Sequence, residues 1–187
     1  MKSVKYLLIG AGLASCEAAK KIRERDPKGT ILMVGDESYV PYHRPHLSKE
    51  FLRGEVPRDK VFFDPEKFYQ DQKIGLILGV AVQRLDVVRK IASLANGEEI
   101  AFEKALIATG GRPVRLNIPG SDLSNVYYLR TLDDSANISA QANRGAKAVI
   151  IGAGFIGMEI AASLTQKGVQ VTVIEAQSHI WPRFAEP

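Results

Sequence analysis

The stretch Tyr6-Leu-Leu-Ile-Gly10-Ala-Gly12-Leu-Ala-Ser15 decides the fold of this chain, and a second version, Val149-Ile-Ile-Gly152-Ala-Gly154-Phe-Ile-Gly157, follows later. Each begins with a short apolar run, which predicts a buried parallel strand, and continues into a helical pattern. In such a turn the first glycine permits a tight bend, the second lets the backbone approach a pyrophosphate, and the third small residue lets helix and strand pack closely. The helix N-terminus then offers N–H groups and partial positive charge to phosphates. The two stretches therefore predict two dinucleotide-binding turns.

Each turn is followed by a second apolar strand that ends in an acidic residue. Ile31-Leu-Met-Val34 leads to Gly35-Asp36, and Val171-Thr-Val-Ile174 leads to Glu175. The carboxylates come 36 − 10 = 26 and 175 − 152 = 23 positions after the first glycine of each motif, near the roughly 20 residues at which a carboxylate binds a ribose diol. The alternative is two ordinary strand–turn–helix units, with Asp36 as a turn residue. Two dinucleotide sites indicate chemistry that passes between two dinucleotides.

Composition argues against several classes of protein. The chain has 187 residues and a formal net charge of +4, but its basic residues are scattered, which argues against nucleic-acid binding and leaves an acidic protein partner open. No apolar run approaches the ~20 residues of a membrane span. The histidines show no zinc-like spacing, so we expect no metal site. A lipoprotein-like signal ending at Cys16 would remove the first glycine turn, and we therefore expect a cytoplasmic protein.

The remaining pattern predicts an α/β chain in two parts. We expect short helices near 47–53 and 65–72, a strand over 74–85, a hairpin turning at Asn96-Gly97, and strands over 99–102, 105–108, 147–151 and 169–174. The glycines and proline of 109–113 mark the boundary between domains 1–112 and 113–187. Thr131-Leu-Asp-Asp134 has the pattern of a capping box, so we assign its two aspartates to helix capping rather than catalysis.

Six segments, in order along the whole chain, resemble the FAD-dependent, NADH-oxidising reductases of ferredoxins and rubredoxins. This is the putidaredoxin reductase-like group of the pyridine nucleotide-disulfide oxidoreductases. The segments are 10–15, 34–36, 44–49, 108–113, 128–133 and 152–159, and the most specific is Arg44-Pro-His-Leu-Ser-Lys49. The resemblance implies two three-layered Rossmann-like units, with FAD in 1–112 and NADH in 113–187. It also implies that electrons pass from NADH through FAD to a small iron–sulfur ferredoxin or a rubredoxin.

The resemblance also assigns roles to single residues. Lys49 and Glu159 would be the catalytic residues, as an ion pair beside the flavin's reactive nitrogen that joins the two domains. From the residues alone, a glutamate such as Glu159 is more often a solvated helix residue. Arg44 and Lys49 could equally form a solvated basic loop. The residues expected to bind FAD are Gly10, Gly12, Ala14, Ser15, Asp36, Arg44, Lys49, Val82, Thr109, Gly110 and Arg130. Those expected to bind NADH are Gly152, Gly154, Gly157, Glu159 and Glu175.

The chain departs from the family's pattern at two positions, and it has only one cysteine. Ser15 replaces the third glycine but is small enough for close packing, and His46 stands where a second proline is common. Cys16 is the single cysteine, and it lies in the helix after the first turn. We therefore expect it to pack as a small hydrophobe, and a thiol relay within this chain is excluded.

The family's chains are about twice as long as this one, so we expect a fragment in which both units are incomplete. We expect the 187 residues to hold FAD poorly or not at all and to be inactive alone. The second sheet would have an unpaired edge, so we expect either a homodimer that completes it or a partly disordered C-terminal end. The alternatives are a non-catalytic dinucleotide-binding or regulatory protein of the apoptosis-inducing-factor kind, and an inert fragment. A flavin spectrum in purified protein, and its bleaching by NADH, would separate the three.

Overall fold

The computed structural model describes residues 1–181, which form two compact units. The first unit comprises Met1–His43 and Phe62–Gly111, and the second comprises Arg44–Val61 and the chain from Arg112 onward. The first unit ends at Gly111, whereas the sequence predicts a domain boundary between residues 112 and 113. The segment 44–61, however, packs within the second unit, although the sequence placed it in the first domain. Which cofactor each part binds stays a prediction.

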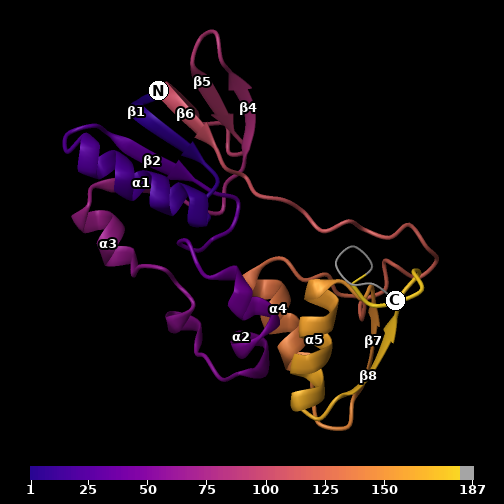
Figure 1. The fold of residues 1–187 in the computed structure, drawn as a ribbon. Coiled ribbons are helices and arrows are strands. Elements are labelled where there is room, and N and C mark those ends of the chain that lie inside the picture. Colours follow the sequence, from indigo (N-terminus) through magenta and orange to yellow (C-terminus); the bar gives the residue numbers. More distant parts are fainter. Residues whose placement is uncertain (182–187) are drawn as a thin grey trace. The chain divides into compact units, whose positions relative to one another are not determined.

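A six-stranded sheet forms the centre of the first unit, in the order β3-β2-β1-β6-β5-β4. Its first four members pair in parallel, and a hairpin adds two antiparallel strands at one edge. The strands are β1 (Lys2–Ile9), β2 (Ile31–Val34), β3 (Ile74–Ile77), β4 (Val82–Asp86), β5 (Ile91–Leu94) and β6 (Glu99–Ile107). The helix α1 (Leu13–Arg25) connects β1 to β2 along one face of the sheet (Figure 1). This arrangement confirms the expected α/β, Rossmann-like fold class.

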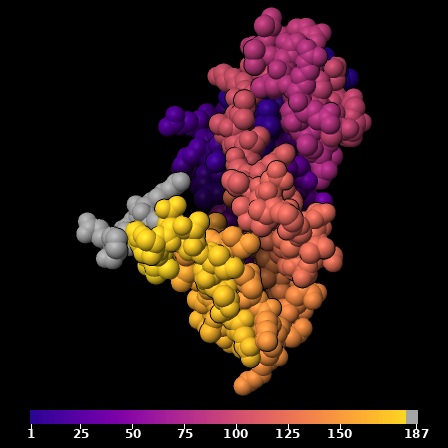
Figure 2. Space-filling model, turned by 90° about the vertical axis from the view of Figure 1, so that its right-hand side faces the viewer, coloured from indigo at the N-terminus to yellow at the C-terminus, as the bar shows by residue number. Residues whose placement is uncertain are grey.

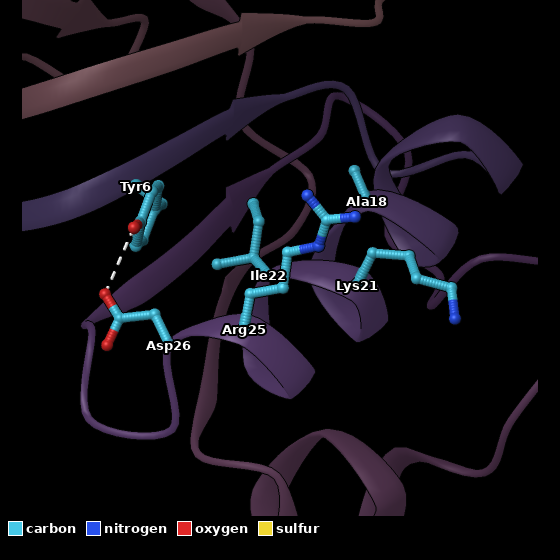
Figure 3. Close-up of a pocket in the computed structure, with 6 residues that line it drawn as sticks. All are labelled: Tyr6, Ala18, Lys21, Ile22, Arg25 and Asp26. Carbon is cyan, nitrogen blue, oxygen red and sulfur yellow. Dashed lines mark hydrogen bonds between the residues drawn. The ribbon is translucent and has the colours of Figure 1, made fainter.

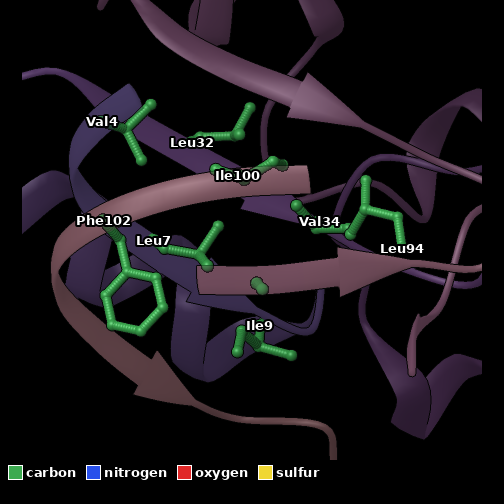
Figure 4. Close-up of a cluster of buried hydrophobic side chains, with 9 residues drawn as sticks. Val4, Leu7, Ile9, Leu32, Val34, Leu94, Ile100 and Phe102 are labelled. Carbon is green, nitrogen blue, oxygen red and sulfur yellow. The ribbon is translucent and has the colours of Figure 1, made fainter. Parts of the chain in front are cut away.

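Alternation along the parallel strands divides the hydrophobic core of this unit into two clusters. On β1, Leu8 packs with Cys16 of α1 and with Tyr69 of α3 (Glu66–Asp71). Leu7 and Ile9 belong instead to the other cluster, which includes Ala92 and Leu94 of the hairpin (Figure 4). Successive side chains of a strand point to opposite faces, so β1, β2 and β3 each contribute to both clusters. The result is a layer of helices, a parallel sheet and a β-ribbon.

Two strand predictions in this unit were wrong in detail. The apolar run 74–85, expected as one strand, forms β3 and β4, because the chain turns at Gly79 with a φ of +74°. The two short runs expected at 99–102 and 105–108 form the single strand β6. The predicted hairpin is confirmed, and Gly97 supplies its left-handed position with a φ of +85°.

The second unit contains a smaller parallel sheet of β7 (Lys147–Ile151) and β8 (Gln170–Ile174). The elements packed with it are α4 (Leu132–Gln141), α5 (Phe155–Gln166), the 3-10 helix η1 (Arg44–Ser48) and α2 (Glu50–Arg53). In the described residues the other face of this sheet is apolar and exposed, with Val149 at 62%, Ile151 at 59% and Ile174 at 53% exposure. Within residues 1–181, no helix is long and apolar enough to cross a membrane.

The predicted capping box at the start of α4 is confirmed. The backbone N–H of Asp134 donates to Thr131 Oγ1 at 3.1 Å, and Asp134 Oδ2 accepts the N–H of Thr131 at 2.7 Å. Two donors at the helix start are thereby satisfied reciprocally. Oδ2 of Asp134 thus serves this structural role.

Candidate functional site

The first glycine turn connects β1 to α1, and its two glycines have different structural roles. Gly10 has a φ of +110°, and a Cβ there would lie 2.1 Å from the carbonyl oxygen of Ala108, so the position requires glycine. A Cβ on Gly12 would meet nothing within 4 Å. The space beside Gly12 is therefore open to an incoming group, which matches the predicted approach of a pyrophosphate.

The start of α1 supplies donors to this open space. The first helical hydrogen bond runs from the N–H of Cys16 to the carbonyl of Gly12 at 3.0 Å. The N–H groups of residues 13–15 therefore lie in the first turn, where no intrahelical acceptor exists. Together with the positive end of the helix dipole, they form a site suited to an anion.

Ser15 adds a polar group that no described residue satisfies. Its side chain is 0% exposed, and its Oγ has no hydrogen-bond partner among residues 1–181. An unpaired buried hydroxyl costs about 1–3 kcal/mol. The open space at Gly12 and the donors of the first turn fit a phosphate group. The full burial of Ser15 agrees with the close packing expected of a small residue at this position, and its expected part in FAD binding stays a prediction.

Other predicted FAD residues of the first unit gather near this turn. The carboxyl ends of β1, β2 and β6 adjoin, because Gly10 N–H donates to Val34 O at 2.7 Å and Ala108 N–H donates to Ile9 O at 2.7 Å. Asp36 is exposed just after β2, where a Cβ on Gly35 would come 2.5 Å from Cβ of Ala11 in the turn. The remaining members lie in the first turn of α1, directly after β6, and at the start of β4; they are Ala14, Thr109, Gly110 and Val82.

The second glycine turn repeats this geometry between β7 and α5. Gly152 has a φ of +105°, and a Cβ on Gly154 would again meet nothing within 4 Å. A Cβ on Gly157 would lie 2.0 Å from the carbonyl oxygen of Gly152, so close packing requires the third glycine here. Met158 N–H donates to Gly154 O at 3.0 Å, which leaves the first-turn N–H groups of α5 without intrahelical acceptors. The three glycine roles predicted from the sequence are thus distinct in the structure.

Glu175 lies over the second turn, as its position after β8 predicts. Its Oε2 accepts the N–H of Ala153 at 2.6 Å, and its Oε1 accepts the N–H of Gln177 at 2.9 Å. These two hydrogen bonds hold the pKa of Glu175 below its ordinary value, and the bond from Ala153 has the larger effect. The carboxylate is therefore ionised and oriented beside the turn.

An aromatic side chain that the sequence did not single out also lies at the second turn. The backbone N–H of Trp181 donates to Ala153 O at 3.0 Å. Its ring lies 5.8 Å from the ring of Phe155, the first residue of α5. The segment after β8 is at the surface (Figure 2, yellow), and Ile180 is 46% exposed. No motif in the sequence marks Trp181, because its contact depends on the path of the loop.

The expected ion pair between Lys49 and Glu159 is present. Lys49 Nζ lies 2.8 Å from Oε1 of Glu159, and Ser48 Oγ donates to Oε2 at 2.5 Å. Burial of the carboxyl favours its neutral form, but the hydrogen bonds from Lys49 and Ser48 outweigh burial and hold the pKa of Glu159 below its ordinary value. Both partners lie in the second unit, so the expectation that the pair joins two domains was wrong. Their place beside a flavin stays a prediction.

Arg44 and Arg130, both expected at the FAD, are also in the second unit and contact each other. Arg44 Nη1 donates to the carbonyl of Arg130 at 2.6 Å, and Arg130 N–H donates to Asp134 Oδ2 at 3.0 Å. The basic segment 44–49 is therefore bound into the unit rather than simply solvated. The roles of both arginines toward a cofactor remain untested.

A pocket of about 360 Å³ lies in the first unit, beside the middle and the C-terminal end of α1 rather than at its N-terminal glycine turn. Residues from the middle and the C-terminal end of α1 line it together with Tyr6 (Figure 3). Asp26 at its rim accepts from Lys5 at 2.7 Å and from Tyr6 at 3.1 Å, and Lys5 in particular lowers the pKa of Asp26 to about 2. The acidic group of this pocket is thus already engaged, and the pocket is separate from the first glycine turn.

The single cysteine is buried in α1. Cys16 is 1% exposed, its Sγ lies 3.4 Å from the hydroxyl of Tyr69, and burial raises the pKa of its thiol. A neutral buried thiol is a poor nucleophile. The position agrees with the predicted packing role. Among residues 1–181, no three His, Cys, Asp or Glu side chains cluster so as to hold a metal ion.

Comparison with known proteins adds relatives of similar sequence and structure. The chain is 39% identical to a rubredoxin-NAD(+) reductase of Pseudomonas putida over 97% of its own length and 47% of that protein. The ferredoxin reductase for the CYP199A2 system from Rhodopseudomonas palustris superimposes with a TM-score of 0.92 at 36% identity, over 100% of this chain and 46% of that one. The reductase in a covalent putidaredoxin reductase–putidaredoxin complex gives 0.93 at 30% identity, over 100% and 46%.

The chain thus spans about half the length of the relatives that it matches. The family model described as pyridine nucleotide-disulphide oxidoreductase matches residues 4–187. Because that match covers nearly the whole sequence, including both glycine turns, the chain belongs to the pyridine nucleotide-disulphide oxidoreductase family.

Proposed function

We propose that this chain provides the FAD-binding and NADH-binding turns of a reductase that passes electrons to a small iron–sulfur ferredoxin or a rubredoxin. The observation that carries the proposal is the repeated turn: two glycine-rich helix starts, each with open space at its second glycine, and each beside a strand that ends in a carboxylate. The names of the relatives, which include rubredoxin and ferredoxin reductases, support the same class of reaction.

The chain's own residues would bind and orient the two cofactors. The first-turn N–H groups of α1 and the Ser15 hydroxyl would hold the FAD pyrophosphate, and Asp36 would accept hydrogen bonds from its adenosine ribose. The start of α5 would hold the NADH pyrophosphate, with Glu175 at the ribose. FAD, when bound, supplies a centre that takes up a hydride and gives up electrons singly.

Lys49 and Glu159 are the residues we assign to the reacting edge. In this proposal Lys49 holds positive charge near the flavin, and Glu159 fixes the ammonium by an ion pair of 2.8 Å. No side chain is required as nucleophile or general acid, since the cofactors carry the chemistry and the protein supplies placement and electrostatics.

The expected electron acceptor follows from the same proposed reaction. The formal net charge of +4 suits an acidic electron acceptor. The cytoplasm stays the compartment expected from the sequence. A homodimer that completes the sheet of β7 and β8 at its open edge stays a prediction, which sedimentation of the purified chain would test.

The test of the function is anaerobic addition of NADH to FAD-loaded protein of full family length that contains these residues, because we expect residues 1–187 alone to be inactive. We expect the visible flavin absorbance to bleach and then to recover when an oxidised ferredoxin or rubredoxin is added. Bound FAD that NADH does not reduce would contradict a reductase and favour a regulatory dinucleotide-binding protein. Protein of full family length that takes up no FAD at any concentration would contradict the cofactor assignment itself.

A further inference from the structure

A set of serine hydroxyls from two helices holds the segment that carries Lys49. Ser135 Oγ of α4 donates to Leu47 O at 2.7 Å, and Ser163 Oγ of α5 donates to Ser48 O at 2.6 Å. One turn further along α4, Ser139 Oγ donates to Leu52 O at 2.8 Å. We call these three serines, Ser135, Ser139 and Ser163, the serine clamp. Because each bond ends on a backbone carbonyl, the clamp fixes the path of residues 47–52.

Ser48 stands at the centre of this arrangement and contacts the ion pair directly. Its Oγ donates to Glu159 Oε2 at 2.5 Å, while Lys49 Nζ occupies the other oxygen, Oε1, at 2.8 Å. The consecutive residues Ser48 and Lys49 thus bind the two carboxylate oxygens of Glu159. Ser48 is 5% exposed, so bulk water competes poorly for its hydroxyl.

Ser48 also spans one turn of α5. Its side chain reaches Glu159, and its carbonyl accepts from Ser163 four residues later. Residues four apart on a helix lie on the same face, so both bonds fix Ser48 against one strip of α5. A lysine side chain is long and flexible and gives little orientation by itself. The short side chain of Ser48 is the rigid element of the group.

We propose that Ser48 is the positioning residue of the Lys49–Glu159 pair. Its hydroxyl holds the carboxylate of Glu159 in the one orientation that presents Oε1 to Lys49. The wider consequence, that Ser48 places the ammonium of Lys49 for flavin chemistry, rests on the proposed function. If Ser48 had only a structural role, it would contribute to stability in the same way as Ser139, and its removal would leave the titration of Glu159 unchanged.

The charge environment of Glu159 provides a readout that separates these roles. Burial disfavours the charged carboxylate, and the bonds from Lys49 and Ser48 oppose burial. Glu50 repels the same charge. The other charged side chains on the elements packed against α5 are Arg44, His46, Arg53 and Lys147. Loss of the Ser48 hydroxyl removes one of the two bonds that favour ionisation, and the pKa of Glu159 must then rise.

The experiment is a pH titration of the Glu159 side-chain carboxyl by carbon NMR in the purified chain without cofactor. We expect Ser48→Ala to raise the pKa of Glu159 by roughly one pH unit, and Ser48→Thr, which keeps the hydroxyl, to restore it. Ser139→Ala is the matched control, since it removes a clamp hydroxyl but does not touch Glu159. Ser48→Cys, a near-isosteric weak donor, gives a smaller rise and serves as a second variant if Ser48→Ala does not fold.

The proposal is overturned if neither Ser48→Ala nor Ser48→Cys shifts the Glu159 titration, or if Ser139→Ala shifts it equally. The NMR titration requires no flavin, so it stands apart from the proposed function. In FAD-loaded protein of full family length, Ser48→Ala is then expected to slow flavin reduction by NADH about tenfold, with little change in NADH affinity. A shifted pKa of Glu159, together with no flavin reduction in the unsubstituted protein of that length, would retain the geometric role of Ser48 and reject the reductase.

Discussion

Lys49 and Glu159 form an ion pair with 2.8 Å between Nζ and Oε1, although Lys49 precedes α2 and Glu159 lies in the middle of α5. The side chains are 38% and 33% exposed, so solvent screens the pair in part and its own contribution to stability is modest. Its significance lies in geometry: a charged group of the 44–61 segment is fixed against the helix that starts at the second glycine turn.

Removing one member of this pair should cost more than removing both. Lys49→Met leaves Glu159 partly buried and without its cation, whereas the double change to Met and Gln removes the unpaired charge. We expect a coupling free energy of about 0.5–1 kcal/mol in a double-mutant cycle on chemical unfolding. The same cycle on flavin reduction should also be non-additive. Strictly additive effects in both measurements would show that the pair does not act as a unit.

Glu175 should make the second turn prefer NADH to NADPH. Its carboxylate is held over the turn by the N–H groups of Ala153 and Gln177, and residues 176–182 contain no Lys or Arg. A 2′-phosphate would meet a like charge, which costs on the order of several kcal/mol when desolvated. Dissociation constants for NADH and NADPH, measured by nucleotide fluorescence, test this. Equal or tighter binding of NADPH would contradict it, and Glu175→Gln should narrow the difference.

The same carboxylate should make stability sensitive to acid. The pKa of Glu175 lies below its ordinary value of 4.5 in the folded chain, so its contribution is complete above about pH 4.5 and is lost as pH falls through the lowered folded pKa. Glu175→Gln should therefore flatten the fall in melting temperature between neutral pH and about pH 3. Glu24→Gln, whose ion pair with Lys21 is exposed, is the control and should change little. An unchanged acid profile in Glu175→Gln would contradict this role.

Ser15 should affect the free and the FAD-bound chain in opposite directions. Its buried hydroxyl has no partner among the described residues, so Ser15→Ala is expected to stabilise the cofactor-free chain by about 1–3 kcal/mol. The same change should weaken FAD binding about tenfold, because a phosphate oxygen would lose its donor. Chemical unfolding and equilibrium dialysis measure the two effects. Destabilisation of the cofactor-free chain by Ser15→Ala would show that the hydroxyl is already satisfied.

The two glycine turns could be predicted from the sequence because local rules determine them. An apolar run, glycines at fixed spacing and a helical pattern leave few conformations for the chain, and the bend at Gly10 follows directly. The capping box of Thr131 and Asp134 is equally local. The break at Gly79 was missed because the residues on both sides are apolar and β-prone, so the periodicity continues across the turn.

The surroundings of Lys49 could not be predicted in the same way. The segment 44–61 packs in the second unit through serine hydroxyls that donate to backbone carbonyls, and a carbonyl leaves no mark in the sequence. Ser48 belongs to the Arg44–Lys49 motif, in which the sequence assigns roles to Arg44 and Lys49 but none to Ser48. A serine next to a charged residue is common, and only the structure shows that Ser48 and Lys49 share one carboxylate.

The most direct test of the central claim, FAD at the first turn and NADH at the second, is a pair of glycine-to-alanine variants titrated with both nucleotides. A Cβ at Gly12 or Gly154 meets nothing within 4 Å, and φ is −111° and −75° at these positions, so either alanine should leave the fold intact while it blocks a pyrophosphate. Gly157→Ala, whose Cβ would lie 2.0 Å from Gly152 O, is the control for a disrupted turn. Weak nucleotide binding is sufficient for this test, because the dissociation constants of the variants are compared with each other.

We predict that Gly12→Ala weakens FAD binding at least about tenfold and leaves NADH binding unchanged, and that Gly154→Ala does the reverse. The account would be contradicted if one substitution weakened the binding of both nucleotides. It would also be contradicted if neither substitution weakened the binding of the nucleotide assigned to its turn.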